Sequence, residues 1–585
     1  MGGLLLLLLG AQQADFFYGK LLFKVNPPDS TLEAEVEWHF QGFHGDTLAW
    51  DLSDNMSLLH LSASFPIQYV WRDPGRRRLY MRSAQAINGG REWVRVSYRG
   101  IPSGSGFGSY AVRSHATGWA VWTLSQPYGA PDWLFCQDGL GDKVDSLDMC
   151  VITPSSLIGV GNGKLVADSI DAQGRRWRHF QHRYPIAIYL IAFAASNYVI
   201  QEYLIQTPFH RFTLRNYVYP QDTAVARRLS EQFIPYIVWL EERLGPYPFA
   251  REDYNQVQIG WRGGMEHQTI TFFGSYSLEL WAHELAHQWF GDWVTCGSWR
   301  DIWLNEAFGT YLGGTVFEAV APQSWKPWLK AMINVAWRDT QRTIYVEDTT
   351  DVWRIFHYPT TYAKGALALH TLRTYVGDTV FWEGLRAYLN RHAKGFARTD
   401  DFREAVRSNF GEEVTNAFLQ SWIYSPHYPQ ARLQWTDEGA VLLISERAYP
   451  MRLPLRVLTA SGSQVESMVD FMNNPARVRF SEEVLRWEID PDTLSPYWRV
   501  RKGAAPPLSA RIFPNPFSDH LVLHMKGLRR ATLYDLSGRL LASYEGEPQD
   551  EPVRWDVSLP AAGLFLLQME GEKGLMTQAV LRLSP

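Results

Sequence analysis

The chain has 585 residues, of which 46% are hydrophobic and 20% are charged. This length predicts several domains, and the composition excludes a disordered chain because every large segment can bury a core. The 56 basic and 61 acidic residues give a formal net charge of -5, which excludes the basic surface of a nucleic-acid-binding protein. The three cysteines have no metal-ligand spacing, so a disulfide framework and a Cys-rich zinc site are also excluded.

Residues 1–14 are predicted to be a signal segment. Six leucines at residues 4–9 precede small and polar residues, as in the apolar region and cleavage zone of a secretory signal. The basic region that usually comes first is missing, so a frayed apolar terminus is the alternative. No stretch approaches the roughly 18 apolar residues of a membrane-spanning helix, and we expect no transmembrane segment.

The rest of the chain changes its hydrophobic period twice. Short runs such as residues 32–38 alternate apolar and polar side chains, as half-buried strands do. After residue 220, apolar residues recur every three or four positions, which predicts helices, and strand-like runs return near residue 430. The predicted domains are a β domain at 15–220, an α/β domain at 221–429, a small β domain at 430–503, and a linker with a final β domain at 504–585.

Residues 278–290 contain a candidate metal site. His283 and His287 share one face at helical spacing, and two neutral imidazoles four residues apart can bind one zinc ion. Glu306 follows after eighteen intervening residues, and a His₂Glu set leaves one position for water, as in catalytic zinc sites. Glu284 lies between the histidines and can act on that water without being a ligand. The alternative is a hydrogen-bonded polar helix face.

Zinc in such a site lowers the pKa of its water to about 7, and Glu284 would take the proton as general base. The attacked carbonyl oxygen then needs a hydrogen-bond donor. Tyr362 is a candidate for this donor, but spacing alone does not distinguish it among 28 tyrosines, and a core aromatic is the alternative.

Four motifs in this order resemble the M1 family of zinc aminopeptidases, which are gluzincins with the pattern H-E-x-x-H-x18-E. They are Gly-Gly-Met-Glu at 263–266, H-E-L-A-H-Q-W-F-G-D from His283, W-L-N-E-A-F around Glu306, and Y-A-K-G from Tyr362. The resemblance covers roughly residues 15–500. It implies a multidomain α+β fold with a saddle-shaped β N-terminal domain and a thermolysin-like α/β catalytic domain. It also implies one zinc ion per chain on His283, His287 and Glu306, with Glu284 as general base and Tyr362 as transition-state stabiliser.

The same resemblance implies how a peptide is held. Glu266 would bind the free α-amino group together with Gln126, which precedes Cys136 by the family's spacing. This anchor would limit cleavage to the first peptide bond, because it fixes the amine at one distance from the metal. The backbone of the glycine pair would let a peptide add as an extra strand. The remaining residues of the implied substrate-binding set are Gly263, Gly264, Met265 and His267.

Three features depart from the family pattern. His267 replaces an asparagine and could place a positive charge beside the amine site. Gly313 stands seven positions after Glu306, where many members carry an acidic residue. No long helical array follows residue 430, so we expect the C-terminal helical domain of larger members to be missing.

The last segment resembles a type IX secretion sorting domain, a small β-sandwich that directs cargo across the outer membrane. The resemblance rests on residues 512–516, 531–539 and 559–567. An ordinary immunoglobulin-like accessory domain is the alternative. The resemblance implies a secreted or surface-attached protein whose partner is the secretion machinery.

The leading hypothesis is a zinc-dependent aminopeptidase that acts on peptides with a free N-terminus and binds no nucleic acid. The first alternative is an M1-type hydrolase of other specificity, such as an endopeptidase or an epoxide hydrolase. The second is a catalytically silent surface-binding protein on the same fold. The complete set of His283, Glu284, His287, Glu306 and Tyr362 argues against a silent protein, because binding alone requires none of them.

Overall fold

The computed structural model describes residues 14–73, 75–428 and, with gaps, 430–582. The gaps are at residues 436–439, 446–447, 460–461, 474–475, 480–483, 490–498, 502–510, 514–516, 518, 550, 560–561 and 573. The predicted signal run at 4–9, the linker at 503–507 and part of the C-terminal motif therefore lie outside the described residues. The chain divides into two compact units, of which the first runs to His370 and resumes over Gly377–Thr415.

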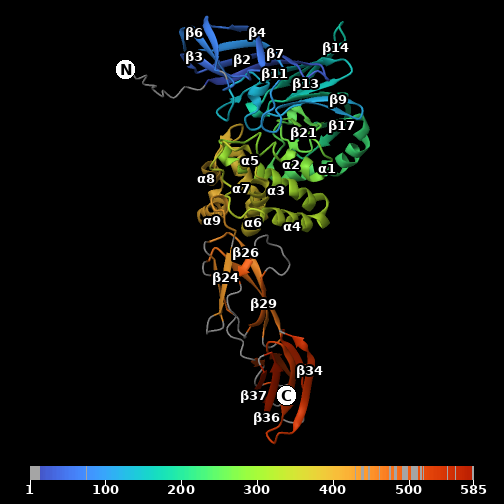
Figure 1. The fold of residues 1–585 in the computed structure, drawn as a ribbon, viewed down its shortest axis with the longest axis vertical. Coiled ribbons are helices and arrows are strands. Elements are labelled where there is room, and N and C mark those ends of the chain that lie inside the picture. Colours follow the sequence, from blue (N-terminus) through green and yellow to red (C-terminus); the bar gives the residue numbers. More distant parts are fainter. Residues whose placement is uncertain are drawn as a thin grey trace, which may run out of the picture. The chain divides into compact units, whose positions relative to one another are not determined.

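The first unit begins with a β-rich part (Figure 1). Its largest sheet has seven strands in the order β13-β14-β11-β1-β2-β7-β4. In β2 and β7 alternate side chains are buried, as the period-two pattern predicts. The strands of this sheet are β1 (Asp15–Val25), β2 (Leu32–Gln41), β4 (Met56–Ala63), β7 (Glu92–Gly100), β11 (Leu147–Pro154), β13 (Lys164–Ile170) and β14 (Arg175–His182).

Three smaller sheets complete this part of the first unit, with strand orders β3-β6-β5, β12-β16-β9-β8 and β10-β15. Their strands are β3 (His44–Asp51), β5 (Ile67–Asp73), β6 (Arg78–Asn88), β8 (Tyr110–His115), β9 (Gly118–Thr123), β10 (Lys143–Val144), β12 (Ile158–Gly161), β15 (Ile186–Ala187) and β16 (Phe193–Ser196).

A five-stranded sheet of order β17-β18-β19-β21-β20 leads to the helices. β18 pairs in parallel with β19, and the crossover that a parallel pair requires is the helix α1 (Thr223–Leu244). The sheet therefore crosses residue 220, where the sequence pattern placed a domain boundary. Its strands are β17 (Val199–Gln206), β18 (Arg211–Val218), β19 (Tyr254–Gln258), β20 (Gly264–Met265) and β21 (Ile270–Phe273).

Helices α2 (Leu278–Ala286) and α3 (Trp303–Val320) pack against each other, and they are drawn below this sheet in Figure 1. The Ser277 hydroxyl caps α2 by accepting a hydrogen bond from the backbone N–H of Leu280 at 3.3 Å. The first fourteen residues of α3 are buried, so it is a core helix rather than an amphipathic one. The remaining elements are α4 (Trp325–Ala336), α5 (Val352–Ile355), the π-helix η7 (Tyr358–Lys364), α6 (Gly365–Val376), α7 (Asp378–Arg391), α8 (Thr399–Phe410), α9 (Glu412–Phe418), β22 (Thr295–Cys296) and β23 (Phe396–Ala397).

The second unit contains two groups of strands. In the first group, the sheet orders are β28-β25-β24-β30 and β27-β26-β29. These strands are β24 (Gln430–Trp435), β25 (Ala440–Ser445), β26 (Arg452–Thr459), β27 (Gln464–Asp470), β28 (Ala476–Arg479), β29 (Val484–Ile489) and β30 (Arg499–Arg501).

The last group of strands forms a β-sandwich. Its sheets, of order β31-β32-β35 and β34-β33-β36-β37, share one buried apolar cluster that includes Leu521, Leu533 and Leu567. The predicted multidomain α+β fold is therefore confirmed. Among the described residues, no helix is both long and apolar enough to cross a membrane. The strands are β31 (Arg511–Phe513), β32 (His520–His524), β33 (Leu528–Tyr534), β34 (Leu540–Gln549), β35 (Val553–Asp556), β36 (Gly563–Gly571) and β37 (Gly574–Arg582).

Candidate active site

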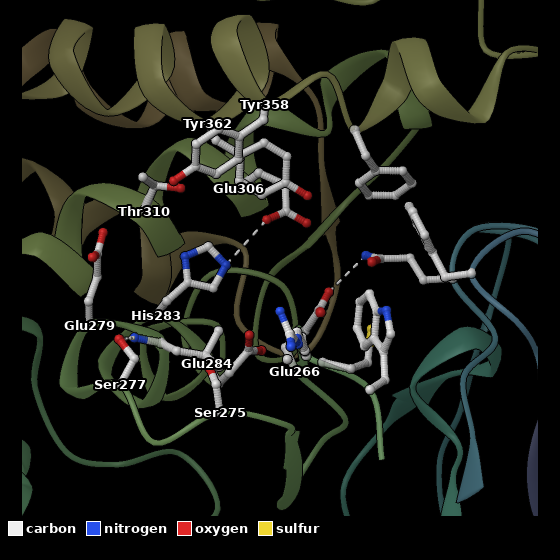
Figure 2. Close-up of a pocket in the computed structure, with 18 of the residues that line it drawn as sticks. Glu266, Ser275, Ser277, Glu279, His283, Glu284, Glu306, Thr310, Tyr358 and Tyr362 are labelled. Atoms are coloured by element: carbon white, nitrogen blue, oxygen red, sulfur yellow. Dashed lines mark hydrogen bonds and ion pairs between the residues drawn. The ribbon is translucent and has the colours of Figure 1, made fainter. Parts of the chain in front are cut away.

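A cavity of about 420 Å³ in the first unit brings together most of the predicted site residues (Figure 2). Its walls come from the β-rich part, the segment that leads into β20, helices α2 and α3, and η7. Of the predicted residues, those that line the cavity are Gln126, Gly264, Met265, Glu266, His283, Glu284, Glu306 and Tyr362. His287 lies directly behind this wall, beside His283 and Glu306.

Three side chains converge at the centre of the site. The Nε2 atoms of His283 and His287 are 3.0 Å apart, and a Glu306 oxygen lies 3.5 Å from the first and 3.4 Å from the second. His287 is the residue that follows α2, and it still has helical backbone angles. Its Nδ1 is 2.9 Å from the carbonyl oxygen of Phe290, to which it donates, so its Nε2 atom is left to face the other two groups.

This arrangement fits a zinc ion. Two ligands bound at about 2.1 Å to a tetrahedral ion lie about 3.4 Å apart, close to the observed separations of 3.0 to 3.5 Å. A single cation at this point could take one donor atom from each side chain and compensate the buried negative charge of Glu306. The donors are two nitrogens and one oxygen, the set found in catalytic zinc sites with an open position.

Glycines in α3 allow the two helices to approach closely enough for this convergence. A Cβ atom at Gly309 would lie 2.6 Å from the Nε2 atom of His287. A Cβ atom at Gly313 would lie 3.0 to 3.1 Å from three atoms of His283, two of them backbone. Gly313 therefore brings α3 into direct contact with the backbone of α2, at the position where the family resemblance implies an acidic residue in many members.

Glu284 borders the cavity with at least one carboxylate oxygen that no described residue pairs with. Only 3% of its surface is exposed, and its Oε2 atom has no hydrogen-bond partner among the described residues. Burial raises the pKa of Glu284 well above its usual value. A Cβ atom at Gly264 would lie 2.1 Å from the Glu284 Oε1 atom, so the backbone of β20 lies against this carboxylate only because residue 264 is glycine.

Glu266 and Gln126 meet at one end of the cavity. The Gln126 amide donates to a Glu266 oxygen at 2.8 Å, although 140 positions separate the two residues in sequence. Burial raises the pKa of Glu266. Both side chains are buried, so the remaining Glu266 oxygen is a desolvated acceptor that a cation can occupy.

Aromatic side chains surround this end of the cavity. The Phe107 ring lies 6.1 Å from that of Trp261 and 5.3 Å from that of Phe356. Gly263 does not line the cavity, and a Cβ atom there would lie 2.5 Å from the Trp261 ring, so its glycine lets this ring pack against the chain. The Phe107 loop is held by the buried Asp132 carboxylate, which accepts hydrogen bonds from Arg77, Ser103, Ser105 and Ser109.

His267 lies outside the cavity lining and is fully buried. Its ring packs edge-on against Phe272 with the centroids 4.4 Å apart, and neither ring nitrogen has a partner among the described residues. Burial lowers the pKa of His267 to about 3. His267 is therefore neutral at physiological pH, and the suggested positive charge beside the amine site is excluded.

Tyr362 lies beside the three converging side chains. The Tyr362 ring is 6.2 Å from the His283 ring at an angle of 23°. The ring of Tyr358, four residues earlier in the chain, lies 5.2 Å from the Tyr362 ring. Burial, with Glu306, Glu266 and Glu284 nearby, raises the pKa of Tyr362 well above its usual value. Its hydroxyl therefore keeps its proton and remains a donor. It belongs to a π-helix, a local geometry that often marks functional sites.

The cavity lining also includes residues that the sequence did not indicate, among them Phe107, Glu279, Thr310 and Tyr358. Two of them had a usable signal, because Glu279 precedes His283 by four positions and Thr310 follows Glu306 by four, so each shares a helix face with a candidate ligand. Phe107 had no such signal, because it reaches the cavity on a loop of the β-rich part.

Two family models match the chain. Residues 275–422 match the peptidase family M1 domain, and residues 511–581 match the secretion system C-terminal sorting domain.

Several curated proteins are similar to part of the chain. It is 35% identical over 176 residues to Aminopeptidase N of Lactococcus lactis subsp. cremoris (strain MG1363), a match that covers 28% of this chain and 21% of the relative. It is 33% identical over 210 residues to Aminopeptidase N of Streptomyces lividans, covering 32% of this chain and 24% of the relative. The chain thus spans between a fifth and a quarter of the length of these curated relatives.

A crystal structure of a mutant M1 zinc metallopeptidase from Deinococcus radiodurans, bound to a Tyr-Ser-Ala substrate, has a similar fold. The TM-score is 0.59 at 22% identity, and the match covers 71% of this chain and 95% of that chain.

The burial of His267 predicts a pH-dependent loss of stability. Its folded pKa of about 3 lies below the unfolded value of about 6.5, so the unfolded state binds more protons below pH 6.5. The free energy of unfolding then falls by about 1.4 kcal/mol for each pH unit below 6.5. His267→Asn removes this contribution, so its urea midpoint should decline less between pH 7.5 and 5.5 than that of the wild type. His60→Asn, at an exposed histidine, is the control and should follow the wild type. Equal declines in all three proteins would contradict the assignment.

Proposed function

The chain contains a peptidase family M1 domain and a secretion system C-terminal sorting domain, and on this basis we propose that it is an exported zinc aminopeptidase. The reaction is hydrolysis of the first peptide bond of a peptide with a free N-terminus. The observation that carries the proposal is one cavity that holds both a His₂Glu donor set and the Glu266–Gln126 pair. The sorting domain supports release to the exterior or attachment at the cell surface.

His283, His287 and Glu306 would hold one zinc ion per chain. The chemistry that zinc supplies when bound is Lewis acidity, which polarises the scissile carbonyl and makes water a stronger acid. The protein orients the two imidazole rings before any metal binds. The Phe290 carbonyl accepts a hydrogen bond from the His287 ring, and the backbone of Gly309 accepts one from the His283 ring.

Glu284 acts as the general base and then as the proton donor. Its unpaired Oε2 atom accepts a proton from the attacking water and passes it to the nitrogen of the leaving peptide. The raised pKa of Glu284 favours this transfer, because a carboxylate in water is too weak a base. The Tyr362 hydroxyl donates to the carbonyl oxygen as negative charge develops there.

Glu266 and Gln126 define which bond is cut. The Glu266 carboxylate binds the α-ammonium group, while Gln126 holds one of its oxygens in place. β20 is the edge strand of its sheet and has no outer strand partner among the described residues, so a peptide can pair with it in extended form. A substrate held at its N-terminus and along this edge presents its first peptide bond to the metal site.

The free-amine requirement is the direct test of the proposal. Zinc-loaded protein should hydrolyse leucine p-nitroanilide, with no detectable turnover of the N-acetylated form, because the acetyl group removes the charge that Glu266 binds. Glu266→Ala should lower kcat/KM about 10²–10³-fold, since the ammonium loses its buried counter-charge. Glu231→Ala, at an exposed position of α1, is the control and should retain activity.

Two results would overturn the aminopeptidase proposal. Equal hydrolysis of blocked and free substrates would indicate another hydrolase specificity, and zinc-loaded protein without turnover would indicate a binding protein.

Glu284→Gln should separate metal binding from turnover. The amide has nearly the same shape but accepts no proton, so zinc content should stay at one ion per chain while kcat falls about 10²–10⁴-fold. Zinc is measured by elemental analysis, and turnover is measured with leucine p-nitroanilide. Activity within a few-fold of the wild type would exclude Glu284 as the base, and Glu231→Gln controls for loss of one carboxylate.

Gly309→Ala should weaken zinc binding without touching a ligand. The added Cβ atom would meet the His287 ring at 2.6 Å and displace it from the other two donors. We expect about 10–100-fold weaker zinc affinity, measured by competition with a chelator, in a protein with an unchanged circular dichroism spectrum. Gly90→Ala is the control, because no atom lies within 4 Å of its Cβ position. Unchanged affinity in Gly309→Ala would contradict a zinc site on these residues.

A further inference from the structure

A carboxylate lies in the cavity at a place where the proposed mechanism does not use one. Glu279 is on α2, four residues before His283, so the two side chains share one helix face. It lines the cavity and is half-buried. Figure 2 shows Glu279 on one side of the His283–Glu306 pair and Glu266 on the opposite side.

Glu279 is held in position but carries no counter-charge. Its Oε1 atom accepts a hydrogen bond from the Trp328 indole at 2.5 Å. No basic side chain forms an ion pair with it in the part of the chain that the structure describes. Burial raises the pKa of Glu279, and the Trp328 bond offsets part of this effect. A half-buried carboxylate with one oxygen fixed and the other facing a cavity is a site for a cation.

Glu279 has both aromatic and polar neighbours, because Trp328 donates to it, Tyr358 lies close by, and hydroxyl groups also line the cavity. Ser275, Ser277 and Thr310 line the cavity there. The Thr310 hydroxyl is buried and has no hydrogen-bond partner among the described residues. This end of the cavity therefore offers a negative charge together with an unused hydroxyl.

The position of Glu279 relative to the metal donors identifies the part of a substrate that it faces. If Glu266 holds the N-terminal amine, the peptide beyond the scissile bond extends away from Glu266, toward the Glu279 side. Four helical residues span about 6 Å along α2, and one extended peptide residue spans about 3.3 Å. Glu279 is therefore within reach of the first or second residue after the cut bond.

We infer that Glu279 is a specificity-determining residue that selects a cationic side chain, lysine or arginine, on the leaving peptide. This inference rests on the proposed aminopeptidase function. The ammonium or guanidinium group pairs with the free Glu279 oxygen, and the Thr310 hydroxyl accepts a further hydrogen bond from it. The apolar stem of the side chain follows the cavity wall.

The test compares matched tripeptides with leucine at the N-terminus, on zinc-loaded full-length protein. Leu-Lys-Ala and Leu-Ala-Lys are each compared with the peptide that has norleucine in place of lysine. For at least one pair, kcat/KM should be about tenfold higher for lysine in the wild type, the usual range for a charged hydrogen bond. The ratio should fall to about 1 in Glu279→Gln, whose amide oxygen can still accept from Trp328.

The ratio compares two substrates on one protein, so a general loss of active enzyme cancels. Glu231→Gln removes an exposed carboxylate outside the cavity and should keep the wild-type ratio. Tripeptide binding to Glu284→Gln, with and without Glu279→Gln, gives the same comparison as dissociation constants and requires no turnover.

A wild-type ratio near 1 for both pairs, or an unchanged ratio in Glu279→Gln, would overturn the inference while leucine p-nitroanilide is still hydrolysed. That substrate has no leaving peptide, so its hydrolysis reports the proposed function alone. If the wild type cleaves neither leucine p-nitroanilide nor the tripeptides, the proposed function fails, and the inference fails with it.

Discussion

The structure depends on the convergence of two imidazole nitrogens and one carboxylate oxygen within 3.5 Å of one another. These groups are buried, and Glu266 and Glu284 lie close by, so three carboxylates share one desolvated region. Burial of so much negative charge is costly unless a cation compensates it. A bound divalent ion would supply this compensation, so the same ion would stabilise the fold locally and complete the proposed catalytic site.

Backbone geometry makes this convergence possible. α2 and α3 approach closely at Gly309 and Gly313, and β20 reaches Glu284 at Gly264. Each of these glycines lies where a Cβ atom would contact a residue of the proposed catalytic set. Their role is steric, because it is the missing side chain that lets a donor or a base take its position.

Much of this site could be predicted from local sequence. His283 and His287 follow from helical spacing, since one face of a helix brings residues four apart together, and Glu306 follows from its separation by eighteen intervening residues from this pair. Local spacing could not predict that Gln126 and Phe107 lie in the site, because both come from the β-rich part and reach the cavity through long-range packing. The sheet that crosses residue 220 was missed because β17 and β18 have the same alternating pattern as the strands before them, and only their pairing with β19 distinguishes them. The possible charge on His267 was excluded by burial, which the sequence does not specify.

The two ends of the cavity differ in a way that suits the proposed exopeptidase activity. At the Glu266 end, a bound ammonium group would lie among aromatic side chains, where low polarity would strengthen the ion pair and fix the substrate's N-terminus. At the Glu279 end, the carboxylate is only half-buried, so the proposed binding of a cationic side chain there would be weaker. Weak binding suits the leaving peptide, because a product held as tightly as the N-terminus would be released slowly and would limit turnover. In the proposed reaction the strong anchor would therefore determine which bond is cut, whereas the weaker carboxylate would adjust which peptides are cut fastest.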